Sequence, residues 1–165
     1  MNKNFYITTP IYYPSANPHM GHAYSSIIAD FFARCKKIQG FNVYFLTGTD
    51  EHGQKIQRSA EKMGMDPLSF CDEISKTFKD LSQTLNLSNK VFIRTTEDRH
   101  KKSVQHLWTE LEKNDEIYLS KYSGWYSVSD EAFYSEEEID TKDSIKISKI
   151  SGSQVEWVEE ESFFF

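Results

Sequence analysis

The chain has 165 residues, of which 38% are hydrophobic and 27% are charged, and its formal net charge is −6. This length can bury a sizeable core, and the composition is that of a globular protein rather than a disordered one. The acidic balance argues against a protein built to coat nucleic acid. No apolar run approaches the roughly 18 residues of a membrane span, and Cys35 and Cys71 are isolated, so we expect reduced thiols, a cytoplasmic location and no membrane partner.

The first 46 residues follow the order strand, loop, helix, strand. Residues 5–9 favour a short strand that ends at Pro10. From residue 20 to residue 38 apolar side chains recur every three or four positions, which predicts a helix with an apolar stripe, and Gly40 supplies its C-terminal cap. Residues 41–46 are almost all apolar, as in a strand buried on both faces. This βαβ order predicts an α/β fold with a parallel sheet.

The segment after this unit is mainly helical. We expect a helix over residues 54–63, stopped by Gly64, and a second helix from Pro67 to about residue 85 with Asp66 as its N-cap. Residues 91–95 predict another strand, and Thr96 is the expected cap of a further helix.

The character of the sequence changes after residue 116. Residues 117–134 are rich in tyrosine and serine and predict an antiparallel hairpin with a turn at Ser123–Gly124. We therefore divide the chain into a βαβ-based part, residues 1–115, and a small β-rich module, residues 116–165. The last three residues are phenylalanines, which suggests a strand cut in its middle and thus a truncated module.

His19 and His22 lie three residues apart where the first strand leads into the first helix. They could share a metal with His52, although the glutamate usual in a zinc-binding helical histidine pair is absent. They could be ordinary surface residues at a helix start. They could also bind phosphate, because the carboxyl edge of a parallel sheet and a helix N-terminus both favour anions.

Several sequence blocks together resemble one family. Pro18–His22 (PHMGH) is similar to the "HIGH" signature of class I aminoacyl-tRNA synthetases. Thr8–Tyr13 (TTPIYY), Gly48–Lys55 (GTDEHGQK), Phe92–Glu97 (FIRTTE) and Arg99–Lys102 (RHKK) resemble the methionyl-tRNA synthetase family in order and spacing. The resemblance covers essentially the whole chain. It implies the first half of a Rossmann-like nucleotide-binding domain, followed by the start of the inserted connective-peptide module.

The resemblance also implies a reaction and a set of site residues. Methionine and ATP, the latter with Mg²⁺, would give methionyl-adenylate, and the methionyl group would then pass to tRNA-Met. His19 and His22 would be catalytic and would bind the ATP phosphates, with Gly21 against the adenine. The methionine pocket would contain Ile11, Tyr13 and Asp50, with Asp50 on the substrate ammonium. Without the resemblance, Tyr13 would be an ordinary loop aromatic and Asp50 the N-cap of the helix at residue 54, and His52 is more typical of a structural hydrogen bonder.

Two segments depart from the family pattern. Ser127 and Asp130 stand where many relatives carry the cysteines of a zinc knuckle, so we expect no structural zinc and a turn held by packing of Trp125, Tyr126 and Phe133. Residues 146–150 (KISKI) resemble the "KMSKS" loop superficially, but their alternation is typical of a strand. The expected KMSKS loop and the anticodon-binding domain are missing.

Two alternatives stay open. Other nucleotidyl-transferring enzymes share an H-x-G-H turn, although they are not expected to carry the block at residues 48–53. The chain could also be an inactive truncated fragment that binds ATP or methionine weakly at most. The sequence does not indicate the oligomeric state.

Overall fold

The computed structural model describes residues 3–142 and 144–165. The chain divides into two compact units between Ser103 and Val104. This division is based on contacts between residues and does not test the predicted domain boundary after residue 115, which stays a prediction. Among the described residues, no helix is both long enough and apolar enough to cross a membrane.

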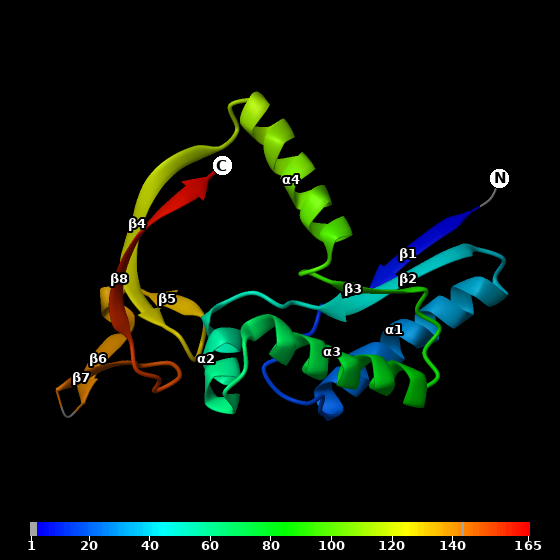
Figure 1. Cartoon of the computed structure of the whole chain (residues 1–165), viewed down its shortest axis with the longest axis horizontal. Coiled ribbons are helices and arrows are strands. Elements are labelled where there is room, and N and C mark those ends of the chain that lie inside the picture. The colour runs from blue at the N-terminus through cyan, green and yellow to red at the C-terminus, as the bar shows by residue number, and fades with distance from the viewer. Residues whose placement is uncertain (1–2, 143) are drawn as a thin grey trace. The chain divides into compact units, whose positions relative to one another are not determined.

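The N-terminal unit contains a parallel sheet of three strands, β1 (Asn4–Thr8), β2 (Asn42–Thr49) and β3 (Val91–Arg94), in the order β1-β2-β3 (Figure 1). The α/β fold and the parallel sheet are thus confirmed. Gly48 is required where β2 and β3 approach, because a Cβ at this position would lie 2.0 Å from the carbonyl oxygen of Ile93.

Four helices follow the predicted boundaries closely: α1 (Met20–Ile38), α2 (Gln54–Met63), α3 (Pro67–Thr84) and α4 (Asp98–Lys113). Gly40 (φ +81°) and Gly64 (φ +67°) follow α1 and α2 in the left-handed conformation that glycine adopts without a steric penalty. The Asp66 carboxylate accepts hydrogen bonds from the backbone of α3, as predicted. The predicted cap at Thr96 is wrong, because its hydroxyl donates to Glu51 instead.

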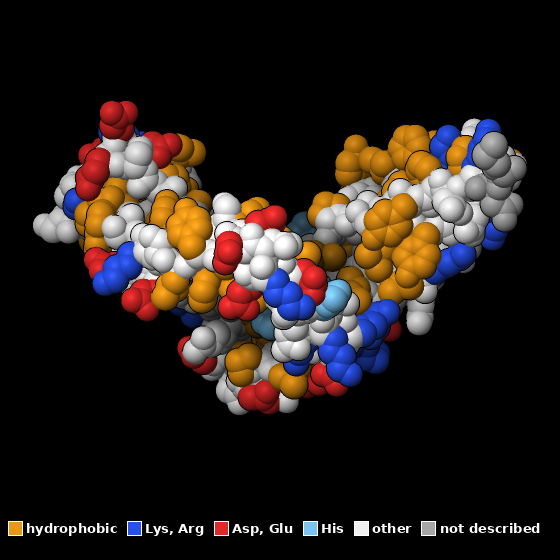
Figure 2. Space-filling model, turned by 90° about the horizontal axis from the view of Figure 1, so that it is seen from above, with side chains coloured by type: hydrophobic (Ala, Val, Ile, Leu, Met, Phe, Trp, Pro, Cys, Tyr) orange, Lys and Arg blue, Asp and Glu red, His pale blue; other side chains and the backbone are white. Residues whose placement is uncertain are grey.

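Two small cores hold this unit together. Ala29 and Ala33 of α1 pack on Phe45 of β2, and a second cluster joins Ile56 and Ala60 of α2 to α3. The larger apolar side chains of α1 are exposed instead: Tyr24, Ile27, Ile28, Phe31 and Phe32. Figure 2 shows many exposed hydrophobic side chains over this part of the chain.

The strand predicted over residues 41–46 exists but is not buried throughout. β2 begins at Asn42, and its first three residues are exposed or half-buried, whereas Thr47, Gly48 and Thr49 are buried. The aromatic Tyr44 stacks on exposed Tyr6 of β1, with ring centroids 5.7 Å apart. An apolar run can therefore pair in an exposed part of a sheet as well as in a core.

The C-terminal unit is built of antiparallel strands, as predicted. β4 (Tyr118–Ser127) lies between β5 (Ala132–Tyr134) and β8 (Glu156–Phe164), and β6 (Ile139–Lys142) pairs with β7 (Ile145–Ser148). The predicted turn at Ser123–Gly124 is wrong, because both residues lie within β4. Gly124 leaves space there for Phe133, whose ring carbon would lie 3.1 Å from an added Cβ.

Candidate functional site

The predicted site residues lie in two segments that follow the carboxyl ends of β1 and β2. Tyr12 forms a parallel bridge with Thr49 at the end of β2. Its backbone N–H donates to the Gly48 carbonyl at 2.8 Å, and its own carbonyl accepts from the Asp50 N–H at 2.8 Å. This short extension of the sheet brings Ile11 and Tyr13, on either side of Tyr12, beside Asp50 in the backbone register.

His19 and His22 form the N-terminal cap of α1. The Nδ1 atom of His19 accepts a hydrogen bond from the Gly21 N–H at 3.0 Å, and the Nδ1 atom of His22 accepts from the His19 N–H at 3.1 Å. This reciprocal arrangement is a capping box in which imidazoles replace the usual serine and glutamate. The two rings stack with centroids 3.9 Å apart.

These hydrogen bonds also determine the tautomer that each ring adopts when it is neutral. Because both Nδ1 atoms accept, each neutral ring carries its proton on Nε2 and offers one Nε2–H donor. Partial burial, followed by the charge of His19, lowers the pKa of His22 below its usual value. The first turn of α1 contains no acidic residue, so neither the helix dipole nor the histidines face a carboxylate from that turn.

Tyr12 connects the histidine pair to the end of β2, and sequence reasoning missed it. Its ring is buried between His22, with centroids 5.0 Å apart, and Phe78 of α3, at 5.4 Å. Its hydroxyl contacts Ser26 and the carbonyl of His22 in α1. The signal available in the sequence was alternation, because Ile11 and Tyr13 point away from the side of Tyr12 in an extended segment.

The residues expected to bind methionine differ in their exposure and in their hydrogen bonds. Ile11 is 40% exposed. The Tyr13 hydroxyl donates to the carbonyl of His52 at 2.7 Å. Asp50 is half-buried, and within the described residues its carboxylate has no hydrogen bond or ion pair. The alternative role of Asp50 as the N-cap of α2 is contradicted, since Gly53 occupies that position.

Glu51, the residue after Asp50, carries a buried ion pair that the sequence did not indicate. Its side chain is 0% exposed and lies 2.7 Å from the Nε atom of Arg94 at the end of β3. The hydroxyls of Thr49 and Thr96 also donate to this carboxylate. The hydrogen bond to Glu51 raises the pKa of Arg94 against the opposing effect of burial, so the guanidinium keeps its charge. The loop after β2 is thereby fixed to the end of β3.

The described part of the structure does not support His52 as a third ligand of a metal shared by His19 and His22. His52 Nε2 lies 3.4 Å from the Thr95 carbonyl, and within residues 3–142 and 144–165 no three His, Cys, Asp or Glu side chains form a metal-binding group. Both cysteines are free, and burial followed by the charge of Glu51 raises the pKa of Cys71 to about 11. Cys71 is therefore a core residue rather than a nucleophile.

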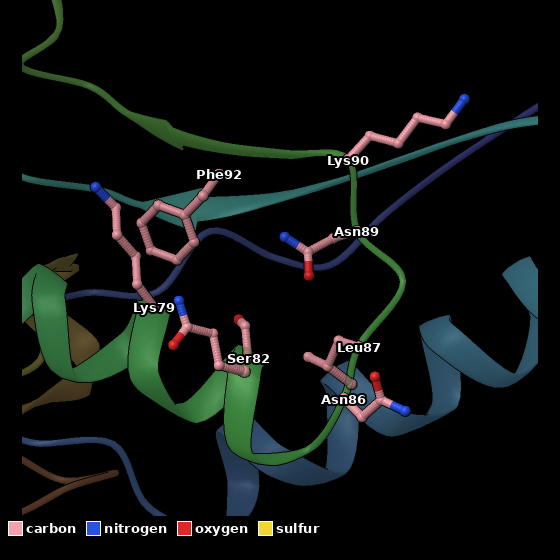
Figure 3. A pocket seen from close by; sticks show the side chains of 8 residues that line it. Lys79, Ser82, Asn86, Leu87, Asn89, Lys90 and Phe92 are labelled. Carbon is pink, nitrogen blue, oxygen red and sulfur yellow. The ribbon is translucent and has the colours of Figure 1, made fainter.

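A cavity of about 540 Å³ lies away from all of these residues. It is formed by the C-terminal half of α3 and the segment that leads into β3, at the opposite end of that strand from Arg94 (Figure 3). Lys79 lies over the ring of Phe92 at its edge, 5.4 Å from the ring centroid. Of its lining residues, only Phe92 belongs to a block that resembles the family, and none is a proposed site residue.

The segment that resembles a KMSKS loop has a structural role in the C-terminal unit. Ile145–Ser148 is strand β7, as its alternation predicted, and Lys146 lies 3.8 Å over the ring of Trp125. Trp125 also packs on Trp157, while Tyr126 packs on Phe133.

Comparison with known proteins places the chain in a family. The model described as "tRNA synthetases class I (M)" matches residues 5–165. A mitochondrial methionine–tRNA ligase from Takifugu rubripes is 51% identical over 169 residues, which cover 99% of this chain and 29% of that protein. The methionine–tRNA ligase of Rickettsia conorii is 50% identical over 165 residues, covering 100% of this chain and 32% of the relative.

A solved structure of Mycobacterium tuberculosis methionyl-tRNA synthetase in complex with methionyl-adenylate superposes with a TM-score of 0.92 and 42% identity, covering 99% of this chain and 32% of that one. The chain thus spans about a third or less of the length of these relatives. The matched family model and the position of the two histidines at the start of α1 indicate the same family. The chain belongs to the class I tRNA synthetase family of the M type.

Proposed function

We propose that this chain carries the phosphate-binding half of a methionine-activating site, and that the intact protein is a methionine–tRNA ligase. In the first step the methionine carboxylate attacks the α-phosphorus of ATP and pyrophosphate leaves, giving methionyl-adenylate. In the second step the terminal ribose hydroxyl of tRNA-Met attacks the methionyl carbonyl and AMP leaves.

The observation that carries this proposal is the histidine cap. His19 and His22 use Nδ1 to hold the start of α1, so the Nε2–H group of each ring stays available where a helix N-terminus already favours phosphate. Donors fixed in advance stabilise the charge that develops on the α-phosphate without reorganisation. The proposed place of Gly21 against the adenine agrees with its exposure beside His19.

The methionine side of the site is proposed around Asp50. Its half-buried carboxylate is suited to the substrate ammonium group, because a charge-assisted bond orients the reacting carboxyl end. Ile11 and Tyr13 would contact the side chain, and an aromatic neighbour stabilises a thioether by about 0.3–1.5 kcal/mol. Arg94 and Glu51 would support this arrangement by holding the loop in place.

The remaining partners follow from the proposed reaction. ATP would be used with Mg²⁺, and tRNA-Met would be the acceptor in the intact protein. A cytoplasmic location is proposed from the sequence and from the bacterial relatives, although one similar protein is mitochondrial. We further propose that the 165-residue chain alone does not activate methionine, because it spans so little of its relatives.

The test is ATP–pyrophosphate exchange by the intact protein with a panel of amino acids. His19→Asn and His22→Asn are the informative variants, because asparagine can accept the capping hydrogen bonds but lacks the Nε2–H donor. Each is expected to keep its helix content and to lose about 10²- to 10³-fold in exchange rate. His106→Asn makes the same change at an exposed position of α4 and is expected to leave the rate unchanged.

Four outcomes would count against the proposal. Exchange with leucine but not methionine would refute the specificity, and unchanged exchange in both cap variants would refute the phosphate role. Exchange at full rate by the 165-residue chain would refute its inactivity. If the intact protein exchanges no amino acid, the alternative of a weakly binding, inactive fragment is supported instead.

A further inference from the structure

Two short turns of the C-terminal unit have the same local construction. In the turn after β4, the buried hydroxyl of Ser127 accepts a hydrogen bond from the Asp130 N–H at 3.3 Å. In the turn after β7, the buried hydroxyl of Ser148 accepts from the Ile150 and Ser151 N–H groups at 3.1 and 3.3 Å. Each turn thus has a buried serine at its first position and a polar side chain three residues later.

Side chains at this spacing on two facing turns are the donor pattern of a zinc knuckle, but these residues do not fit the metal. Structural zinc takes thiolates and imidazoles, whereas the four positions here hold Ser127, Asp130, Ser148 and Ser151. A serine hydroxyl is neutral at pH 7, so the set offers Zn²⁺ a single negative charge. The donor chemistry therefore argues against a metal.

The Asp130 carboxylate makes the connections between the two turns. One oxygen, Oδ1, accepts from the Ser153 hydroxyl at 2.8 Å, and the other, Oδ2, accepts from Ser151 and from Tyr134. Ser151 and Ser153 lie 21 and 23 residues away along the chain. Tyr134 belongs to β5, so one side chain joins the turn after β4, the strand after it and the turn after β7.

We propose that Asp130 is the structural centre of this unit and takes the place of a metal ion, holding the two turns together by hydrogen bonds to an anion rather than by coordination. The pattern is reversed relative to a zinc site. In a zinc knuckle four anions or imidazoles surround a cation, whereas here hydroxyl donors surround one carboxylate. The pKa of Asp130 is lowered to about 2, chiefly by the hydrogen bonds from Ser151 and Tyr134, in agreement with an ionised centre.

This proposal does not depend on the proposed function, and the chain itself provides its reporter. All three tryptophans, Trp108, Trp125 and Trp157, lie in the C-terminal unit. Tryptophan fluorescence during urea unfolding therefore reports on the surroundings of residues in this unit. Asp130→Ala is expected to raise the unfolding equilibrium constant more than tenfold. Ser153→Ala removes a single donor and keeps the charge, so it is expected to have a smaller effect.

The matched control is Asp140→Ala. Asp140 is an exposed carboxylate of β6 in the same unit, and within residues 3–142 and 144–165 its oxygen accepts only from the adjacent Thr141 N–H. This variant is expected to change the equilibrium constant less than twofold. A chelator is expected to leave the wild-type transition unchanged, and elemental analysis is expected to find no stoichiometric zinc. Stoichiometric zinc, a chelator-sensitive transition, or equal effects of the Asp130 and Asp140 changes would overturn the proposal.

A converse variant keeps the proposal testable if Asp130→Ala does not fold. Cysteine at positions 127, 130, 148 and 151 (S127C/D130C/S148C/S151C) would replace the hydrogen-bonded centre with four thiolates. If the two turns face each other as in a knuckle, the reduced variant binds one zinc ion and its unfolding becomes chelator-sensitive. Failure to bind zinc would show that the turns do not have the geometry on which the comparison with a metal centre rests.

Discussion

Removing one partner of the buried ion pair between Glu51 and Arg94 should destabilise the N-terminal unit strongly. Arg94→Met keeps most of the side-chain volume but leaves the Glu51 carboxylate, which is 0% exposed, without its countercharge. Breaking a buried pair in this way costs about 3–5 kcal/mol. The second contact of Arg94, to the 57% exposed carboxylate of Asp72, adds about 0–1 kcal/mol.

The reverse change should cost less, which makes the reasoning specific. Glu51→Gln removes the buried charge, and the amide oxygen can still accept from the Thr49 hydroxyl. Arg94 is 15% exposed and keeps its contact with Asp72, so its charge stays partly compensated. The double variant should recover part of the loss, because neither charge is then left alone.

The assay is urea unfolding followed by far-ultraviolet circular dichroism, because α1, α2 and α3 all belong to the N-terminal unit. With a slope of about 2 kcal/mol per molar urea, the Arg94→Met midpoint should fall by about 2 M. Arg94→Lys is an intermediate variant. It keeps the charge, but a single ammonium group cannot replace the separate contacts of Nε with Glu51 and of Nη1 with Asp72.

Lys76→Ala provides the control, since its pair with Asp80 is exposed, at 75% and 53%, and is worth about 0.3–0.5 kcal/mol. If Arg94→Met costs no more than Lys76→Ala, the buried pair does not hold the loop. If Glu51→Gln costs more than Arg94→Met, the uncompensated carboxylate is not the source of the cost.

Three further predictions concern the same unit. Because folding lowers the pKa of His22 from its ordinary value of 6.5, the folded state favours the neutral ring. The resulting stability is full above pH 6.5, the pKa in the unfolded chain, and is lost as the pH falls towards the lower pKa of the folded state. Urea unfolding at about pH 7.5 and 5.5 should show this loss, and His22→Asn should remove it. Gly53→Ala should cost about 2–3 kcal/mol, since φ is +112° and the new Cβ would lie 2.3 Å from the hydroxyl of Tyr13. Gly64→Ala, at φ +67° in open space, should cost about 1 kcal/mol. Equal costs of the two changes in thermal unfolding would refute the clash at Gly53. Cys71, with its pKa raised to about 11, should react with a thiol reagent at neutral pH only after unfolding, and fast labelling in the native state would contradict its burial.

Local signals in the sequence were sufficient for the ends of most elements. Gly40, Gly64 and Asp66 determine helix ends through backbone geometry and capping, which depend on a few neighbouring residues. Ser123–Gly124 misled because the reason for Gly124 is not local: its missing side chain leaves space for Phe133 of another strand. A glycine that serves a neighbouring strand cannot be distinguished from a turn glycine by its own sequence context.

The apolar stripe of α1 shows a different limit. Periodicity correctly predicted a helix, but the face that packs on β2 carries Ala29 and Ala33, while the larger Phe31 and Phe32 are exposed. Small residues let a helix approach a sheet closely, and a hydrophobicity pattern gives them little weight. The pattern therefore predicts that a helix has an apolar face, and it does not say which face meets the sheet.

The site residues that were missed are each adjacent to one that was chosen. Tyr12 precedes Tyr13, and Glu51 follows Asp50, and in both pairs the missed residue is the buried one. In an extended segment neighbouring side chains point to opposite sides, so a chemically similar pair becomes one structural and one accessible group once the register is fixed. Here the bridge between Tyr12 and Thr49 fixes that register. Deleting Ile11 would move Tyr13 into the buried position of Tyr12 and Tyr12 into the exposed position of Ile11, so the accessible side chains of this site depend on the buried residue between them to fix the register.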